Sequence, residues 1–308
     1  MTSSALDRLP PLATTGVGSL PFDDPAAAVR HAARAYDVPF CPQLPALDGD
    51  MVREWLGGDP RRCGWAPGRD RQRPAAWDAF TALLATAPPA HGVVKLQVTG
   101  PVTLAVALDR SDTGLAAEVA QWLAVSVAAQ VERLRALGLA TLLLVDEPGL
   151  GGLERLGLGV WDRLRDTGAA AWGLHVCGDV PWGLVDAVDA DVLSFDVTRT
   201  ALAPHARRAL RRLLRRGGRV AWGALDPLDP GTSGDAAGLV AAALHAVAGD
   251  GLERDAVAAR SLLTPACGTG RLTPGTERLL AAGLGGAADG LRAALRANRA
   301  APTTTRRS

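Results

Sequence analysis

Two side chains that commonly bind metals lie two residues apart at the end of an apolar run. His175 and Cys177 follow Trp172-Gly173-Leu174. Residues two apart on an extended strand project from the same face. The nitrogen and sulfur donors of His175 and Cys177 could therefore bind one metal ion together. A lone His-x-Cys pair is weak evidence, so this hypothesis requires further ligands at the ends of other strands.

Apolar runs that alternate with helical patterns indicate the strands that would position such ligands. Eight strands are predicted, at Ala13–Ser19, Val38–Leu44, Val93–Thr99, Thr141–Asp146, Ala170–Cys177, Val192–Val197, Val220–Leu225 and Leu262–Cys267. The predicted helices are Pro25–Tyr36, Ala75–Ala87, Ala116–Leu137, Leu153–Thr167, Val180–Val188, Pro204–Arg216, Asp235–Ala248 and Pro274–Asn298.

Strict alternation of strands and helices predicts parallel pairing, and eight units in 308 residues match an α/β fold with a single (β/α)8 TIM barrel. An open doubly wound sheet is the alternative. Its nucleotide-binding forms need a G-x-G-x-x-G turn, and Pro21 breaks that pattern after Gly16 and Gly18. We expect the barrel to span residues 13–298, between flexible segments at 1–12 and 299–308. The long connection at 45–74 is typical of a loop that covers a site.

The composition argues against several classes of partner. A formal net charge of +1 gives no general attraction to nucleic acid or to a membrane, so we expect neither. No stretch approaches the roughly 20 continuous apolar residues of a membrane span, and the first twelve residues lack a signal-peptide pattern. We therefore expect a cytoplasmic protein, in which the four cysteines are free thiols or metal ligands rather than disulfides.

Polar residues at the carboxyl ends of the predicted strands are candidates for an active site, because TIM-barrel enzymes place their sites there. These residues are Ser19, Asp146, Glu147, His175, Cys177, Asp196, Asp226 and Cys267. His175, Cys177, Asp196 and Cys267 form a donor set that tetrahedral zinc accepts. Each also has a structural explanation on its own: the cysteines as small core residues, and Asp196 as a helix cap or a partner of Arg199.

Seven short stretches carry a resemblance to a known family. They are Thr14-Thr15-Gly16-Val17-Gly18-Ser19-Leu20-Pro21, Gly49-Asp50-Met51-Val52, Thr99-Gly100-Pro101-Val102-Thr103-Leu104, Val145-Asp146-Glu147-Pro148, His175-Val176-Cys177, Asp196-Val197-Thr198-Arg199-Thr200 and Pro265-Ala266-Cys267-Gly268. With these stretches in this order and spacing, the chain resembles the catalytic half of cobalamin-independent methionine synthase. The superfamily also holds uroporphyrinogen decarboxylase and zinc-dependent coenzyme M methyltransferases. The resemblance implies that His175, Cys177, Asp196 and Cys267 bind Zn²⁺.

The chain departs from the family pattern at three points. Asp196 stands where the family usually has glutamate, and Asp48 is the nearest substitute for a glutamate that holds the amino group of homocysteine. The chain also resembles the catalytic barrel alone, without the half that helps to hold methyl-folate. The methyl donor is therefore open. Short stand-alone relatives are thought to use a methylated corrinoid protein, so such a donor protein is a candidate partner, and methyl-folate is the alternative donor.

These observations predict an enzyme, a zinc-dependent thiol S-methyltransferase. Zinc would deprotonate a small thiol, and the zinc-bound thiolate would attack the methyl donor. Homocysteine, which would give methionine, is the expected substrate. We expect Asp146 and His175 to be catalytic. Ser19 and the amides near Gly18 would bind the substrate carboxylate, with Asp48, Asp146 and Glu147 as further substrate-binding residues.

Other readings of the same residues remain open. The zinc site could serve alkyl transfer to another thiol in a biosynthetic pathway. A TIM-barrel hydrolase would use paired carboxylates such as Glu147 and Asp226, or several metal-binding histidines, whereas only His175 ends a predicted strand. A degenerate, non-catalytic barrel could bind zinc for structure. The arginine-rich helix at 205–216 could dock an acidic partner such as a corrinoid protein, or could be a solvated face.

Overall fold

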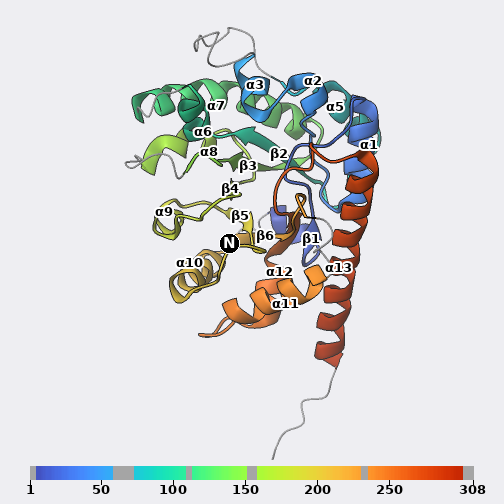
Figure 1. The fold of residues 1–308 in the computed structure, drawn as a ribbon, viewed down its shortest axis with the longest axis vertical. Helices are drawn as coiled ribbons and strands as arrows, with labels where there is room; N and C mark the ends of the chain where they lie inside the picture. Colours follow the sequence, from blue (N-terminus) through green and yellow to red (C-terminus); the bar gives the residue numbers. More distant parts are fainter. Residues whose placement is uncertain (1–4, 58–72, 109–112, 151–157, 230–234, 301–308) are drawn as a thin grey trace, which may run out of the picture.

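A curled, parallel sheet of seven strands forms the centre of the computed structural model, which describes residues 5–57, 73–108, 113–150, 158–229 and 235–300 (Figure 1). The strands are β1 (Ala13–Thr14), β2 (Val93–Thr99), β3 (Ala140–Asp146), β4 (Ala171–Val176), β5 (Val192–Asp196), β6 (Arg219–Leu225) and β7 (Ser261–Pro265). Their order in the sheet is β1-β7-β6-β5-β4-β3-β2, and every neighbouring pair is parallel. The predicted α/β class and parallel pairing are confirmed.

The predicted strand at 38–44 lies between β1 and β2 without forming a regular strand. Single parallel bridges join Phe40 to Lys95 and Gln43 to Ser19. Its backbone also accepts a hydrogen bond at Pro39 from the Lys95 amide (2.8 Å) and donates one from Gln43 to Gly18 (3.1 Å). Pro39 and Pro42 have no amide hydrogen, so this segment cannot complete a ladder on both sides.

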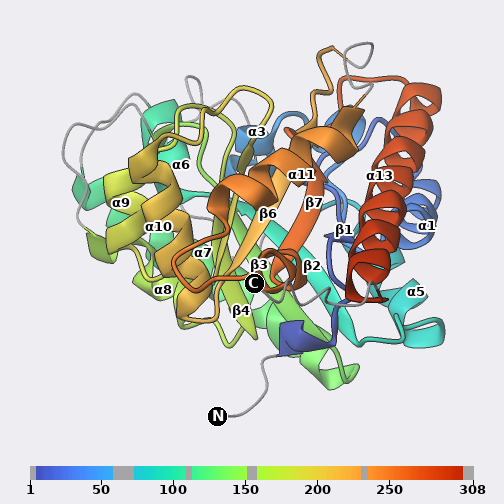
Figure 2. The same ribbon diagram turned by 90° about the horizontal axis from the view of Figure 1, so that it is seen from below.

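Helices surround the sheet and cover its outer face (Figures 1 and 2). Their bounds are α1 (Pro25–Ala35), α2 (Pro45–Asp48), α3 (Met51–Leu56), α5 (Trp77–Thr86), α6 (Pro101–Ala107), α7 (Thr113–Ala136), α8 (Asp162–Arg165), α9 (Trp182–Ala187), α10 (Pro204–Arg215), α11 (Ala236–Val247), α12 (Arg254–Ala259) and α13 (Pro274–Ala300). The described residues also form two 3₁₀ turns, η1 (Ala5–Arg8) and η3 (Leu158–Trp161). The short helices α2, α6 and α12 were not predicted.

The long helix α7 passes a simple test for a membrane span. Residues 114–136 are apolar enough to cross a bilayer by length and composition. Half of the tested stretch is buried, and the helix packs on α6, α8 and β3. A buried core helix of a soluble protein passes the same test, so this finding is weak evidence for a membrane.

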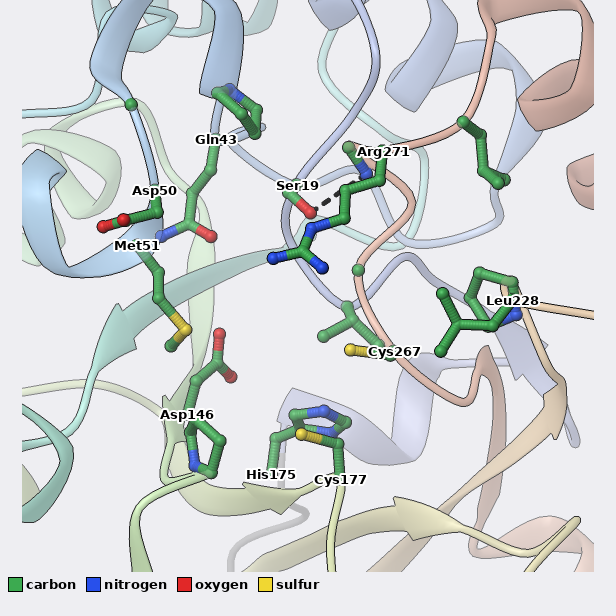
Figure 3. A pocket seen from close by; sticks show the side chains of 18 residues that line it. Ser19, Gln43, Asp50, Met51, Asp146, His175, Cys177, Leu228, Cys267 and Arg271 are labelled. Atoms are coloured by element: carbon green, nitrogen blue, oxygen red, sulfur yellow. Dashed lines mark hydrogen bonds between the residues drawn. The ribbon is translucent and has the colours of Figure 1, made fainter.

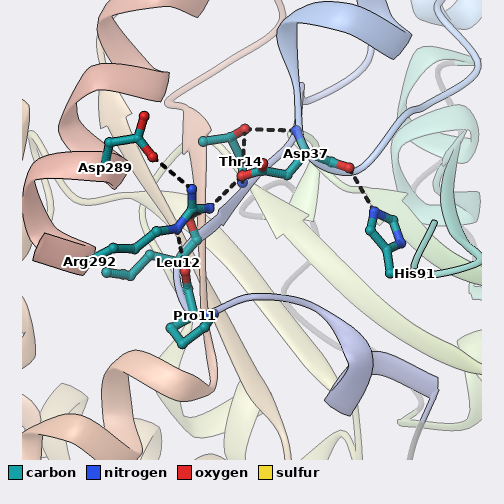
Figure 4. Close-up of polar contacts among 7 residues, drawn as sticks. All are labelled: Pro11, Leu12, Thr14, Asp37, His91, Asp289 and Arg292. Atoms are coloured by element: carbon teal, nitrogen blue, oxygen red, sulfur yellow. Dashed lines mark hydrogen bonds and ion pairs between the residues drawn. The ribbon is translucent and has the colours of Figure 1, made fainter. Parts of the chain in front are cut away.

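A cluster of polar contacts ties α13 and Asp37 to the start of β1 (Figure 4). The Arg292 guanidinium on α13 donates to the carbonyl oxygens of Pro11 (2.9 Å) and Leu12 (3.2 Å) and pairs with Asp37 (2.5 Å). Asp37 also accepts from the amide of Thr14 (2.9 Å). Nearby, Leu6 and Leu9 are buried, so the described part of the predicted flexible N-terminal segment packs against the core. Residues 1–4 and 301–308 lie outside the described residues.

Candidate functional site

A cavity of about 450 Å³ lies at the carboxyl ends of the strands. Ser19, Asp146, His175, Cys177 and Cys267 line it, as Figure 3 shows. The structure therefore brings together five of the predicted site residues, from the end of the first predicted strand and from β3, β4 and the loop after β7. Gly18 lies directly beside the cavity wall, where an added Cβ would come within 2.9 Å of Gln97 Cγ.

His175 faces the cavity with one ring nitrogen and is held by the other. It is the penultimate residue of β4 and lies opposite Asp146 of β3 and Ser194 of β5. Its Nδ1 lies 2.9 Å from Ser194 Oγ, whereas Nε2 is buried and has no hydrogen-bond partner among the residues that the structure describes. A ring nitrogen of this kind is free to bind a metal, and the contact at Nδ1 would fix the ring orientation and tautomer.

The thiols of Cys177 and Cys267 meet beside His175 (Figure 3). A hydrogen bond from Cys177, with a further contribution from His175, lowers the pKa of the Cys267 thiol. The same contact with Cys267, together with burial, raises the pKa of Cys177. Cys267 is therefore the member of the pair that loses its proton more readily than a free cysteine would.

The chemistry of these three donors suits zinc. One imidazole nitrogen and two thiols are ligands that tetrahedral zinc prefers, and the unpaired Nε2 of His175 faces the same cavity as both sulfurs. In the described ranges, however, no three His, Cys, Asp or Glu side chains already stand together as a metal-binding group.

Asp146 supplies a buried carboxylate to the cavity wall. Its Oδ1 atom is buried without a hydrogen-bond partner. Burial raises the pKa of Asp146, while the neighbouring His175 and Lys95 oppose that shift. Lys95 lies deeper and is fully buried, donating to the carbonyl oxygen of Val17 (2.6 Å) and to Gln97 Oε1 (2.9 Å). A carboxylate oxygen without a partner in such a place can accept a hydrogen bond from a bound cationic group.

Glu147 does not line the cavity, although it follows Asp146 directly. Its fully buried carboxylate accepts hydrogen bonds from the amides of Val102 (3.2 Å) and Thr103 (2.9 Å), from the Thr103 hydroxyl (2.7 Å) and from Trp161 Nε1 (2.8 Å). Burial raises the pKa of Glu147 to about 7, although the hydrogen bonds that the carboxylate accepts oppose this shift. Glu147 thus caps the first turn of α6 and anchors the turn that carries Asp146.

Asp196 and Asp48 also lie outside the cavity. Asp196 ends β5, but its Oδ1 accepts from the Thr198 amide (2.8 Å) and hydroxyl (2.5 Å), and Oδ2 lies 3.9 Å from Arg199. The contact with Arg199 is the structural role that the sequence offered as an alternative to zinc binding. Asp48, the last residue of α2, accepts a hydrogen bond from the Ala75 amide (3.2 Å), just beyond the long connection. The structure therefore does not bring either carboxylate to His175 and the two thiols.

The cavity residues that were not predicted include Gln43, Met51 and Arg271. Gln43 is a polar residue near the end of the predicted strand at 38–44, so a complete list of strand ends would have included it. Met51 opens α3, with Asp50 capping the helix from the preceding position. Arg271 follows Cys267 by four residues, in a short loop that no strand or helix pattern marked.

The carboxylates and arginines of the rival hypotheses are engaged elsewhere. Asp226, the proposed partner of Glu147 in a hydrolase, pairs with Arg199 (2.8 Å) and accepts from the Leu228 amide (2.9 Å). On the arginine-rich helix α10, several side chains are likewise paired within the chain. Arg211 pairs with Asp250 (2.6 Å) and Arg216 with Asp189 (3.2 Å). The helix therefore offers less free positive charge than its sequence suggests.

The fold is shared with a methionine synthase. A B12-independent methionine synthase from Shewanella sp. W3-18-1, solved in complex with selenomethionine, superimposes with a TM-score of 0.64 over 93% of this chain and 99% of that one. The sequences are 15% identical, so the likeness shows the fold alone. It agrees with the expected resemblance at the level of the fold. No protein-family model matches the sequence, and no curated protein matches it.

Proposed function

We propose that this chain is a zinc-dependent thiol S-methyltransferase that methylates homocysteine to methionine. One observation carries the proposal: the unpaired, buried Nε2 atom of His175 faces the same cavity as the thiols of Cys177 and Cys267. The methionine synthase with the same fold supports it, since that protein was solved with selenomethionine, a methylated amino acid of the expected product class.

In this proposal, His175, Cys177 and Cys267 would hold the zinc ion. When bound, zinc would lower the pKa of the acceptor thiol and so supply a thiolate nucleophile at neutral pH. The acceptor sulfur would then form a bond to the methyl carbon, while the donor keeps the electron pair of the bond that breaks. Ser194 orients the His175 ring through its contact with Nδ1. Asp146 Oδ1 would accept a hydrogen bond from the substrate ammonium group.

The proposal also covers the closure of the barrel, the methyl donor and the cellular location. We infer that the segment at 38–44 acts as the eighth strand of a single (β/α)8 TIM barrel, since it is bridged to Ser19 on one side and to Lys95 on the other. A methylcorrinoid protein is the proposed methyl donor, and the cytoplasm is the proposed location. Alkyl transfer to a different small thiol would use the same residues.

A hydrolase is less well supported. Its proposed carboxylate pair would need both Glu147 and Asp226 in the cavity, and each is held by other partners. A metal-dependent hydrolase would prefer several histidines and hard oxygen ligands, whereas the described cavity lining offers one histidine and two thiols beside the carboxylates of Asp50 and Asp146.

The proposal is tested by incubating zinc-reconstituted protein with homocysteine and either methylcobalamin or methyl-folate, and by following methionine by mass spectrometry. We expect methionine to form with methylcobalamin, and Cys267→Ser to abolish it. A protein that holds zinc but makes methionine from neither donor, alone or with a corrinoid protein, would contradict the proposed reaction. Hydrolytic activity that survives Cys267→Ser would favour the hydrolase.

A further inference from the structure

Arg271 is a charged residue of the cavity wall that the proposed reaction does not yet use. Figure 3 shows its side chain leaving the loop after Cys267 and projecting over the cavity toward Gln43 and Cys267. Within the ranges that the structure describes, no hydrogen bond or ion pair engages its guanidinium. Arg199, at the same end of the sheet, is by contrast paired with Asp226 at 2.8 Å.

The loop that carries Arg271 is fixed against the end of the first predicted strand. Ser19 accepts hydrogen bonds from the Thr269 amide (3.0 Å) at its carbonyl oxygen and from the Gly270 amide (3.1 Å) at Oγ. Cβ atoms added at Gly268 and Gly270 would lie 2.2 Å from Ser19 Oγ and 2.9 Å from Ser19 Cβ. The backbone before Arg271 therefore lies directly on Ser19, which limits the positions that the guanidinium can reach.

The cavity thus places opposite charges on different parts of its wall. In the described part of the chain, Asp146 presents a buried carboxylate oxygen without a partner, and Arg271 presents a guanidinium without one. In Figure 3, His175, Cys177 and Cys267 form a third part of the cavity wall, apart from both of these charged groups. A zwitterionic α-amino acid carries the complementary pair, an ammonium group for Asp146 and a carboxylate for the guanidinium fork of Arg271.

We infer that Arg271 binds the carboxylate of the acceptor and thereby restricts the enzyme to α-amino-acid thiols. The Ser19 hydroxyl, which accepts from Gly270, still has its own hydrogen to donate to the same carboxylate. This inference rests on the proposed function for the thiol, but the charge recognition can be tested by binding alone.

The test uses three thiol probes on the zinc-reconstituted protein, with binding followed by calorimetry. Homocysteine carries both charges, 4-mercaptobutanoate lacks the ammonium group, and 3-aminopropanethiol lacks the carboxylate. We expect Arg271→Met to weaken binding of the two carboxylate probes by about 10-fold to 100-fold, the range for a lost hydrogen bond to a charged group, and to leave 3-aminopropanethiol unchanged. Arg271→Lys should recover part of the loss, because it keeps the charge without the planar fork.

Two further variants make the result specific. Asp146→Asn should weaken the binding of homocysteine and of 3-aminopropanethiol, which carry the ammonium group, but not the binding of 4-mercaptobutanoate. Arg208→Met, at an exposed position of α10, is the matched control and should change nothing. Equal effects of Arg271→Met on all three probes, or no effect, would overturn the inference, as would a wild-type protein that binds no carboxylate probe. The expected binding pattern without methyl transfer would support the inference and contradict the proposed reaction.

Discussion

Replacing Glu147 with glutamine should destabilise the protein strongly, although the change removes only one charge. Each carboxylate oxygen accepts two hydrogen bonds: Oε1 from Trp161 and Val102, and Oε2 from the amide and hydroxyl of Thr103. Glutamine has one acceptor oxygen, so its amide nitrogen must face two of these donors. If the nitrogen replaces Oε2, the Thr103 hydroxyl can rotate but the Thr103 amide cannot.

The cost follows from that geometry. One buried amide is left without an acceptor, at about 1–3 kcal/mol, and the remaining bonds lose their charged acceptor, so the expected loss is about 2–4 kcal/mol. Urea unfolding of the wild type and of Glu147→Gln measures the free energy of unfolding directly. Glu118→Gln, at an exposed position of α7, is the control. A loss for Glu147→Gln no larger than that of the control would refute the assigned capping role.

Three other substitutions test separate parts of the structure. Asp196→Asn should keep the zinc content and the methyl-transfer rate of the wild type, because Thr198 already holds that carboxylate. Elemental analysis measures the zinc content, and initial rates measure the methyl transfer. Loss of zinc in this variant would show that Asp196 is a ligand. Burial raises the pKa of Glu54 to about 8, so the folded state keeps a proton that the unfolded chain releases. Stability should fall by up to about 1.4 kcal/mol per unit between about pH 5 and pH 8, and Glu54→Gln should flatten that dependence in urea unfolding at several pH values. Arg292→Met should lower the free energy of unfolding by about 2 kcal/mol, because it removes charged hydrogen bonds. The exposed control Arg296→Met should change the free energy of unfolding little. Similar losses for the two variants would contradict the proposed link between α13 and β1.

The strands could be predicted well where a local apolar pattern decides their position. Val93–Thr99 was predicted with the bounds of β2, and the ends of β3 and β6 at Asp146 and Leu225 were also predicted. Each of these strands is buried on both faces, or nearly so. β3 and β6 therefore read as mainly apolar runs, whereas β2 alternates, with Lys95, Gln97 and Thr99 on one face. The segment at 38–44 departs from the prediction because Pro39 and Pro42 cannot donate to a ladder.

The site could be predicted in part, because strand ends identify which residues share one edge of the sheet. That rule found Ser19, Asp146, His175, Cys177 and Cys267. It could not show where a carboxylate at a strand end points.

Two carboxylates and one arginine show what the rule missed. Glu147 turns to cap α6, a helix distant in sequence, and Asp196 turns back to Thr198. Arg271 reaches the cavity because its loop lies on Ser19, a contact between residues more than two hundred positions apart. Such tertiary contacts leave no periodic signal in the sequence.

The zinc content of the purified protein tests the central claim most directly. After reconstitution under reducing conditions and removal of free metal, elemental analysis should find about one zinc per chain, as expected for a single catalytic site. His175→Ala and Cys267→Ser should lose that zinc while remaining folded by circular dichroism. A wild-type protein whose zinc content stays near zero after reconstitution, or variants that hold zinc as the wild type does, would contradict the account.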